Sequence, residues 1–546
     1  MKKQYFLLAS LALGMAACTN DTLTPDEIVD EENNSQEEVV SNLQHAKLSS
    51  FNSSQSRVTV FPVTRADDSE PLQLIAEIDN LSKEEGKIPG FELEDRYLSA
   101  TCVFYDEKTG TYYTTYHMQG NNYYTEQENE TGGYIETFTI NENGVPVPGK
   151  VYMSANPSEL SFDFNHLYFD RHQNETDDYY FQFVGDYNVD DDMESRLIAV
   201  GHSSEPSQKE GGKPNTKAII AKLNFDGDSP TIDYATILTG DKLTDGTTNE
   251  DGNLMSLGDE DARDANCVVR KYNHYYVATR KGIANLKASK DELFNPELDK
   301  DGNIYFLKTP GSVKYISQPT FTSGVDFLYL TEDTPKDMTA NTAIPARIIR
   351  NGVNNFYQNN RVDYLAGIES VKDFNWQSGS VWPNISEPIE SISPVDGKNV
   401  FFTGSLNPGA EFVCLGKNGL YINNPTLNWA NPENNIMKFS DKEGGSRPVN
   451  GIFVEDWDEA NGHHYTDGFI YVANGSCLTI LDYYTLEKVA EYSAFKKGEV
   501  EDASANFVHV VKTNDYPNNE HVADRIITVA FGQAGVKVFR FTPPVK

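Results

Sequence analysis

The five cysteines are the residues of this sequence best suited to redox or metal chemistry. Cys102, Cys267, Cys414 and Cys477 each lie inside an apolar run, and none belongs to a C-x-x-C pair. Cysteine is a common buried residue, so we expect four separate core thiols, with one disulfide pair as the alternative. The spacing offers no zinc site, and the sequence predicts no metal and no cofactor.

Histidines and acidic loops are the next candidates for chemistry. His463 and His464 are neighbours in a polar loop, where adjacent side chains of an extended chain point to opposite sides. Aspartates alternate in Asp226–Asp228 and Asp299–Asn303, as calcium loops require, although both segments also suit hairpin turns. Four histidines lie in or beside predicted strands, either as a ring around a common axis or as separate surface residues: His117, His202, His274 and His509.

Catalytic motifs are missing from the sequence. It has no G-x-S-x-G elbow, no H-E-x-x-H pair and no phosphate-binding glycine loop. With 82 acidic residues, no single carboxylate pair stands out as a glycosidase site. An enzyme therefore stays open, but no residue argues for one.

The elements that would position any site are β-hairpins that recur along the chain. Val529–Val538 and Val413–Ile422 match column for column: a strand, a turn with two glycines, and a return strand. Looser copies are Val277–Ile283 and Val472–Ile480. A recurring hairpin predicts an all-β repeat protein, and such repeats close most readily as a β-propeller.

Seven strand groups follow when the hairpin is taken as the unit. They are Thr111–Met118 with Tyr134–Ile140, Arg196–Gly201 with Ala218–Leu223, Tyr275–Leu286, Phe327–Thr331 with Ala346–Arg350, Phe412–Ile422, Phe469–Asp482 and Ile526–Phe541. We therefore expect seven blades. Because an unclosed ring leaves strand edges exposed, we expect Val58–Val63 or Leu93–Cys102 to complete the last sheet.

Inner strands of the blades are predicted from a second repeat, Ala265–Val269 and Ala505–His509, and by position at Ala100–Tyr105, Leu160–Phe164, Gln318–Phe321 and Val449–Val454. Polar residues at or just before these strands would form the rim of a central channel. They either converge on a ligand or hydrogen-bond neighbouring blades, and these candidates are Asp264, Asn266, Gln318, Arg447, Asn450, Asp502 and Asn506.

The late repeats resemble a degenerate propeller family with LVIVD-like repeats. The residues that carry this resemblance are Tyr471–Gly475 followed by Leu478–Asp482. The resemblance covers the last third of the chain and implies a fold only.

The N-terminus resembles that of a bacterial lipoprotein. A basic Met1–Lys3 precedes the apolar Tyr5–Ala17, and the segment ends in the lipobox-like Gly14–Cys18, with Met15 where the family usually has an aliphatic residue. The resemblance implies a signal peptide over residues 1–17 and acyl chains, palmitate among them, on Cys18. Several acyl chains together hold a protein stably at a membrane.

Residues 18–70 are polar and acidic and predict a flexible tether, which leaves 71–546 as the propeller domain. An acidic stretch after the lipidated cysteine is similar to the signal that exports Bacteroidetes lipoproteins to the outer face of the outer membrane, so we expect a cell-surface location. The formal charge of −37 disfavours nucleic-acid partners.

These features together predict a lipid-anchored binding or scaffold protein, with an outer-membrane transporter as a partner. The alternative is a glycan-active hydrolase or lyase, for which sugar-stacking residues would be Trp376, Trp382, Trp429 and Trp457. A third possibility is capture of an iron chelate or another nutrient.

Overall fold

A computed structural model shows an all-β protein. It describes residues between 42 and 544 with gaps, of which the longest are 121–131, 171–195, 206–214, 239–264, 298–305, 318–325, 333–346, 353–399, 403–410, 424–435, 456–467, 495–502 and 514–523. The signal peptide, Cys18 and the four tryptophans lie outside the described residues.

The strands follow one another in antiparallel groups. The first group contains β4 (Arg96–Asp106), β5 (Thr111–Gly120), β6 (Tyr134–Ile140) and β7 (Pro146–Ser154), and the second contains β8 (Ser161–Asp170), β9 (Arg196–Glu205), β10 (Asn215–Asn224) and β11 (Thr231–Thr236). The third contains β12 (Ala265–Lys271), β13 (His274–Thr279), β14 (Gly282–Lys287) and β15 (Phe306–Lys308), and the fourth contains β16 (Ser312–Ser317), β17 (Asp326–Glu332) and β18 (Arg347–Gly352). The fifth contains β19 (Val400–Phe402), β20 (Glu411–Cys414), β21 (Leu420–Asn423) and β22 (Ile436–Met437), and the sixth contains β23 (Val449–Val454), β24 (Phe469–Asn474), β25 (Cys477–Asp482) and β26 (Lys488–Ser493). The last contains β27 (Phe507–Lys512), β28 (Arg525–Ala530) and β29 (Val536–Phe541).

The first strand of each group contacts the first strand of the next, and the cycle closes where β27 contacts β4. Sheets that follow one another and return to the first are the architecture of a β-propeller. The predicted hairpins are confirmed in every group. The seven-blade count stays a prediction, since the side chains of the fourth group and most of the fifth lie outside the described part.

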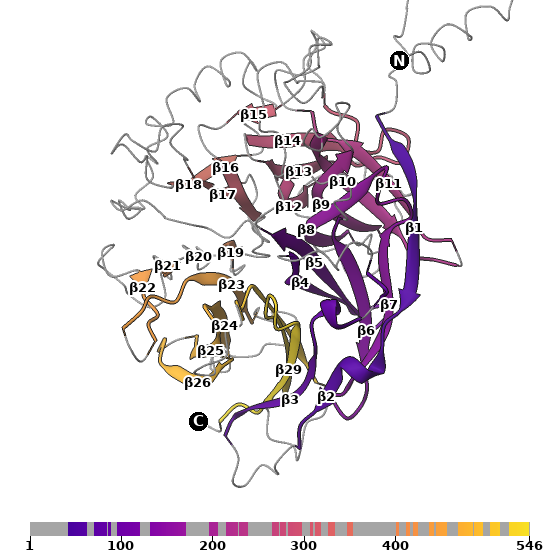
Figure 1. Ribbon diagram of the computed structural model, residues 1–546. Helices are drawn as coiled ribbons and strands as arrows, with labels where there is room; N and C mark the ends of the chain where they lie inside the picture. The colour runs from indigo at the N-terminus through magenta and orange to yellow at the C-terminus, as the bar shows by residue number, and fades with distance from the viewer. Residues whose placement is uncertain are drawn as a thin grey trace, which may run out of the picture. The chain divides into compact units, whose positions relative to one another are not determined.

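The predicted closure of the ring by an N-terminal strand is confirmed, with a different strand beside β29. β29 pairs with β3 (Leu72–Ile78), and β3 pairs with β2 (Val58–Val60). Figure 1 shows the indigo β3 beside the yellow β29. Val58–Val60 therefore belongs to the closing sheet but not next to β29, while Leu93–Cys102 overlaps β4 of the first group.

A further N-terminal strand corrects the predicted linker. β1 (Gln44–Asn52) pairs through its first half with β11 and through its second half with β7, the last strands of two neighbouring groups. β1 thereby joins these groups into one nine-stranded sheet. The tether cannot extend to residue 70 as predicted, because the strands begin at Gln44.

Apolar side chains fill the spaces between successive groups. Ile198, Val200 and Ile220 of the second group pack with Val268 and Val277 of the third in one cluster. Similar clusters join the first group to the last and the sixth to the last. Burial of this apolar side-chain surface stabilises the packing of neighbouring sheets, by roughly 25 cal/mol per Å² removed from water.

The four described cysteines are buried and unbonded to one another, as predicted. A single 3-10 turn, η2 (Leu81–Lys83), follows β3 and is capped by the Asn80 side chain. A second such turn is η1 (Gln55–Arg57).

Candidate functional site

The predicted rim residues lie in different surroundings, and some lie outside the described residues. Asp264, Gln318 and Asp502 lie outside the described residues, and the predicted inner strand Gln318–Phe321 begins just after β16 ends at Ser317. Asn266, Asn450 and Asn506 are buried, each 4% exposed or less. Arg447 forms an ion pair with Glu491 across the sixth group, with 3.0 Å between Nη1 and Oε2.

Asn266 and Asn450 stand at irregularities near the start of a first strand, and Asn506 lies just before β27. The pairing register shifts between Ala265 and Cys267 and between Val449 and Gly451, which makes Asn266 and Asn450 the extra residues of β-bulges. At the same place in β8 and β4 the extra residues are Asn165 and Thr101. A bulge turns one side chain away from the regular alternation of its strand, and here the turned residue is usually asparagine.

Asparagines of three groups hydrogen-bond a neighbouring sheet. The Nδ2 atom of Asn450 donates to the carbonyl of Ala505 at 3.0 Å, and that of Asn506 donates to the carbonyl of Ala100 at 2.9 Å. Asn165, which sequence reasoning missed, donates in the same way to the carbonyl of Ala265 at 3.1 Å.

The accepting carbonyls of Ala100 and Ala265 belong to the residues just before the bulges of β4 and β12, and Ala505 lies just before β27. These bonds join first strands that also contact one another. For Asn450 and Asn506 the structure shows the hydrogen bonds to neighbouring sheets that the sequence offered as one of two alternatives.

A group of titratable side chains lies on β5, β8 and β9. His117 of β5 places Nδ1 2.7 Å from Oδ2 of Asp163 in β8, and the rings of His117 and His202 are 6.5 Å apart. Asp163 is the register partner of His202 in β9 and is 2% exposed. Gly133 approaches so closely that a Cβ there would lie 2.6 Å from Oδ1 of Asp163.

This group brings together two of the four histidines predicted to line an axis or a strand surface, at the junction of the first two groups. The buried carboxylate of Asp163 therefore lies directly against the His117 imidazole. Asp163 was missed, although a lone aspartate inside the apolar run of β8 was a usable signal.

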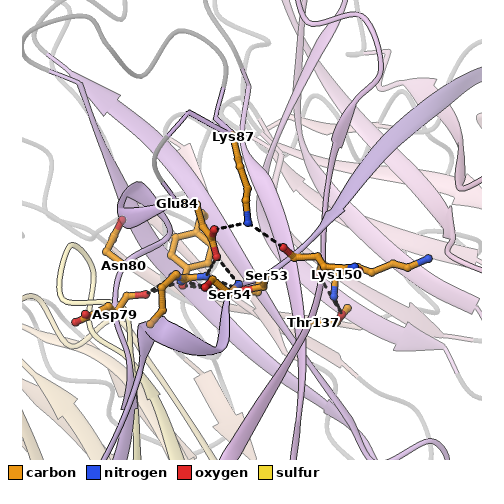
Figure 2. Close-up of polar contacts among 12 residues, drawn as sticks. Ser53, Ser54, Asp79, Asn80, Glu84, Lys87, Thr137 and Lys150 are labelled. Atoms are coloured by element: carbon orange, nitrogen blue, oxygen red, sulfur yellow. Dashed lines mark hydrogen bonds and ion pairs between the residues drawn. The ribbon is translucent and has the colours of Figure 1, made fainter.

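A buried ionic cluster fastens the N-terminal segment to the first group. Arg57 donates from Nη1 and Nη2 to Glu136 at 2.6 and 3.1 Å, and Tyr116 donates its hydroxyl to the same carboxylate at 3.1 Å. Figure 2 shows the neighbouring contacts, in which Lys87 reaches Glu84 at 2.8 Å. The Arg57, Glu136 and Glu84 side chains are at most 3% exposed.

Two further clusters of an arginine, a tyrosine and a carboxylate tie sheets together. Glu455 accepts from Tyr471 of its own group and from Arg525 of the last group. In the third group Tyr275 and Arg270 both donate to Asp170 of the second. Burial first, and then the neighbouring carboxylate, raises the pKa of Tyr471 and of Tyr275 well above its ordinary value, so both phenols stay protonated hydrogen-bond donors.

Of the remaining candidates, Asp299–Asn303 and His463–His464 lie outside the described residues. Gly227 of the other acidic loop has φ of +76°, as a tight turn requires. Within the described ranges, no three His, Cys, Asp or Glu side chains are placed to hold a metal ion, and no helix is long and apolar enough to span a membrane.

Comparison with known proteins yields distant structural resemblance alone. No protein-family model and no curated protein sequence matches the chain. The β-propeller domain of Cps50 (Swd1) from Myceliophteria thermophila is 11% identical with a TM-score of 0.27, covering 82% of this chain and 96% of that one. The extracellular domain of a putative one-component system from B. thetaiotaomicron is 10% identical with a TM-score of 0.21, covering 81% of this chain and 57% of that one. The propeller assignment rests on the strand order and pairing.

Proposed function

We propose that this protein is a lipid-anchored β-propeller of the bacterial outer membrane that holds a ligand or a partner protein at the cell surface. Cys18 would carry the lipid, and residues 19–41 would serve as the tether. An outer-membrane transporter is the partner class that suits a propeller fixed at that membrane.

The observation that supports this proposal is that the segment after the tether, residues 42–78, bonds to strands and loops of several groups. Asn42 hydrogen-bonds Asn295 of the third group, β1 pairs with the second and first groups, and β2 and β3 lie in the last group. The Arg57 cluster adds a buried attachment to the first group.

A protein held by its N-terminus bears any pull on that segment. Because β1 pairs with β11 through its first half and with β7 through its second half, such a pull is shared by the bonds to two strands. The pairing of the N-terminal strands with several groups thus suits a propeller that stays folded while it is tethered and bound to a partner.

Cell fractionation tests the anchor. We expect the wild-type protein and a Thr19→Ala control in the outer-membrane fraction, and a Cys18→Ala variant outside it. Digestion of intact cells by added protease reports on surface exposure. A Cys18→Ala variant that still sediments with membranes would show that lipidation does not hold the protein there.

Capture of partners with the lipidated protein, in detergent and from its native membrane, tests the binding role. Recovery of a transporter, absent from the Cys18→Ala sample, supports the proposal. Conversion of a glycan substrate by the purified protein would favour the enzyme alternative.

A further inference from the structure

The N-terminal segment is fastened to the propeller at two places that differ in burial. The first is β1, which pairs with β11 through Gln44–Lys47 and with β7 through Leu48–Asn52. The second consists of β3 in the closing sheet together with the buried cluster of Arg57, Glu84 and Glu136. Because β1 comes first along the chain, a pull on the N-terminus acts on β1 before it acts on the second place.

Strand β1 is held mainly by backbone hydrogen bonds. Of its nine residues only Leu48 is buried, while Ala46 and Phe51 are partly buried against apolar clusters. Just before the strand, Nδ2 of Asn42 donates to the Thr236 carbonyl at 3.0 Å. Few buried apolar contacts and exposed backbone bonds are typical of a segment that opens locally, without unfolding of the whole domain.

The second attachment is buried. β3 lies between β2 and β29, and four of its seven residues are buried. Arg57 and Glu136 form an ion pair of 2.6 Å whose side chains are 2% and 1% exposed. Separation of a buried charge from its partner is strongly unfavourable. This attachment therefore holds under conditions in which β1 detaches.

The first two groups stay packed against each other without β1. Ile135 and Tyr152 of the first group share an apolar cluster with Phe162 and Leu197 of the second, and Leu48 is the buried member of that cluster that comes from β1. β4 and β5 also contact β8 directly. Detachment of β1 thus leaves the two sheets packed and the ring closed by β3.

The detached strand would change how the propeller hangs from its tether. An extended chain of nine residues, the length of β1, spans about 30 Å. The tether would gain about that length, and its attachment would move from β7 and β11 to the cluster around Arg57. The outer edges of β7 and β11, which β1 covers when it is paired with them, would be exposed.

We propose that β1 is a releasable strap, which detaches from β7 and β11 as a unit while β3 keeps the ring closed. In the anchored protein the strap is a reserve of tether length that a pull draws out before the propeller unfolds. That use rests on the proposed function, whereas the detachment itself is a property of the fold.

Hydrogen exchange of the full-length protein, read by mass spectrometry on peptides of β1 and β3, tests the strap. We expect the β1 amides to exchange at least about a hundredfold faster than the β3 amides, relative to their unfolded rates, because β1 opens locally. Leu48→Ala should speed β1 exchange by about thirtyfold or more, the rate equivalent of the loss of a buried leucine.

Leu72→Ala in β3 is the matched variant, since Leu72 is 8% exposed and Leu48 is 7% exposed. It weakens the closing sheet but not the strap, so it should speed β3 exchange and leave β1 exchange unchanged. The wild-type comparison of the two strands needs no variant, and it decides the question even if Leu72→Ala does not fold.

Three results would overturn the proposal: equal protection of β1 and β3 in the wild-type protein, the same acceleration of both strands in Leu72→Ala, or unchanged β1 exchange in Leu48→Ala. The first two would mean that β1 opens only when the whole fold opens. Membrane fractionation and partner capture do not depend on these rates, so a failure of the strap is distinct from a failure of the proposed function.

Discussion

Two glycines with the same backbone angle allow a matched test of ring closure. Gly535, in the turn between β28 and β29, and Gly227 both have φ of +76°. A Cβ at Gly535 would lie 2.2 Å from the Ile78 carbonyl oxygen of β3, whereas a Cβ at Gly227 would meet nothing within 4 Å. The two alanine variants therefore share the same backbone strain, and only one of them collides with the closing strand.

The expected losses of unfolding free energy follow from these contacts. Alanine in the left-handed region costs roughly 1 to 2 kcal/mol, offset in part by about 0.4 to 1 kcal/mol from a stiffer unfolded chain. Gly227→Ala should therefore cost about 1 kcal/mol. Gly535→Ala must also move β3 by about 1 Å, and overpacking of this kind adds about 1 to 3 kcal/mol.

Urea unfolding followed by intrinsic fluorescence measures both losses. We expect Gly535→Ala to lower the unfolding midpoint clearly more than Gly227→Ala. Equal losses would mean that β3 does not lie against this turn, and the closing sheet described above would be wrong.

Three further perturbations probe the side-chain contacts. Arg57→Met should lower the free energy of unfolding in urea by about 3 to 5 kcal/mol, because it leaves the Glu136 carboxylate buried without its arginine partner. Lys83→Met, at an exposed ion pair, should change it by less than about 1 kcal/mol. Similar losses for the two variants would argue against the buried cluster. Asn506→Leu leaves the Ala100 carbonyl unpaired and should cost about 1 to 3 kcal/mol, and a neutral result in the same assay would remove its inter-sheet role. Burial lowers the pKa of His274 from 6.5 to about 4. Between these pH values the unfolded chain binds a proton that the folded chain does not. The free energy of unfolding therefore falls as the pH falls through this window, by at most about 1.4 kcal/mol per pH unit. His274→Gln should flatten that slope in urea titrations, and an unchanged slope would assign the acid sensitivity to other groups.

The hairpins could be predicted from sequence because their constraints are local. Val529–Val538 and Val413–Ile422 carry strand residues on both sides of glycines, and Gly535 and Gly419 have the positive φ that such turns need. The Ala-Asn repeat also marked the right positions in β12 and just before β27.

The role of those asparagines could not be read from the sequence. An asparagine at a bulge and an asparagine at a ligand site have the same local surroundings, and only the neighbouring sheet shows which carbonyl it bonds. The His117, Asp163 and His202 group is likewise assembled by contact between sheets, from residues as far apart in sequence as 117 and 202.

Strand β1 was missed for a different reason. β1 lies along the last strands of two groups, and only Leu48 of its nine residues is buried. Such a strand has the polar composition of a tether, and its order comes from backbone pairing with β7 and β11. Composition alone therefore placed the end of the linker too late.

Closure of the propeller by an N-terminal strand is the central claim, and a cysteine cross-link between β3 and β29 tests it most directly. Glu77 and Lys537 are register partners whose side chains meet at 2.6 Å, so cysteines there lie within reach of a disulfide. Oxidation of the Glu77→Cys/Lys537→Cys protein should link the two positions within one molecule, as read by mass spectrometry, and raise the urea midpoint. A Glu77→Cys/Lys512→Cys control, with Lys512 on β27 at the far side of that sheet, should stay unlinked. Absence of the first cross-link, or its formation only between two molecules, would contradict the claim.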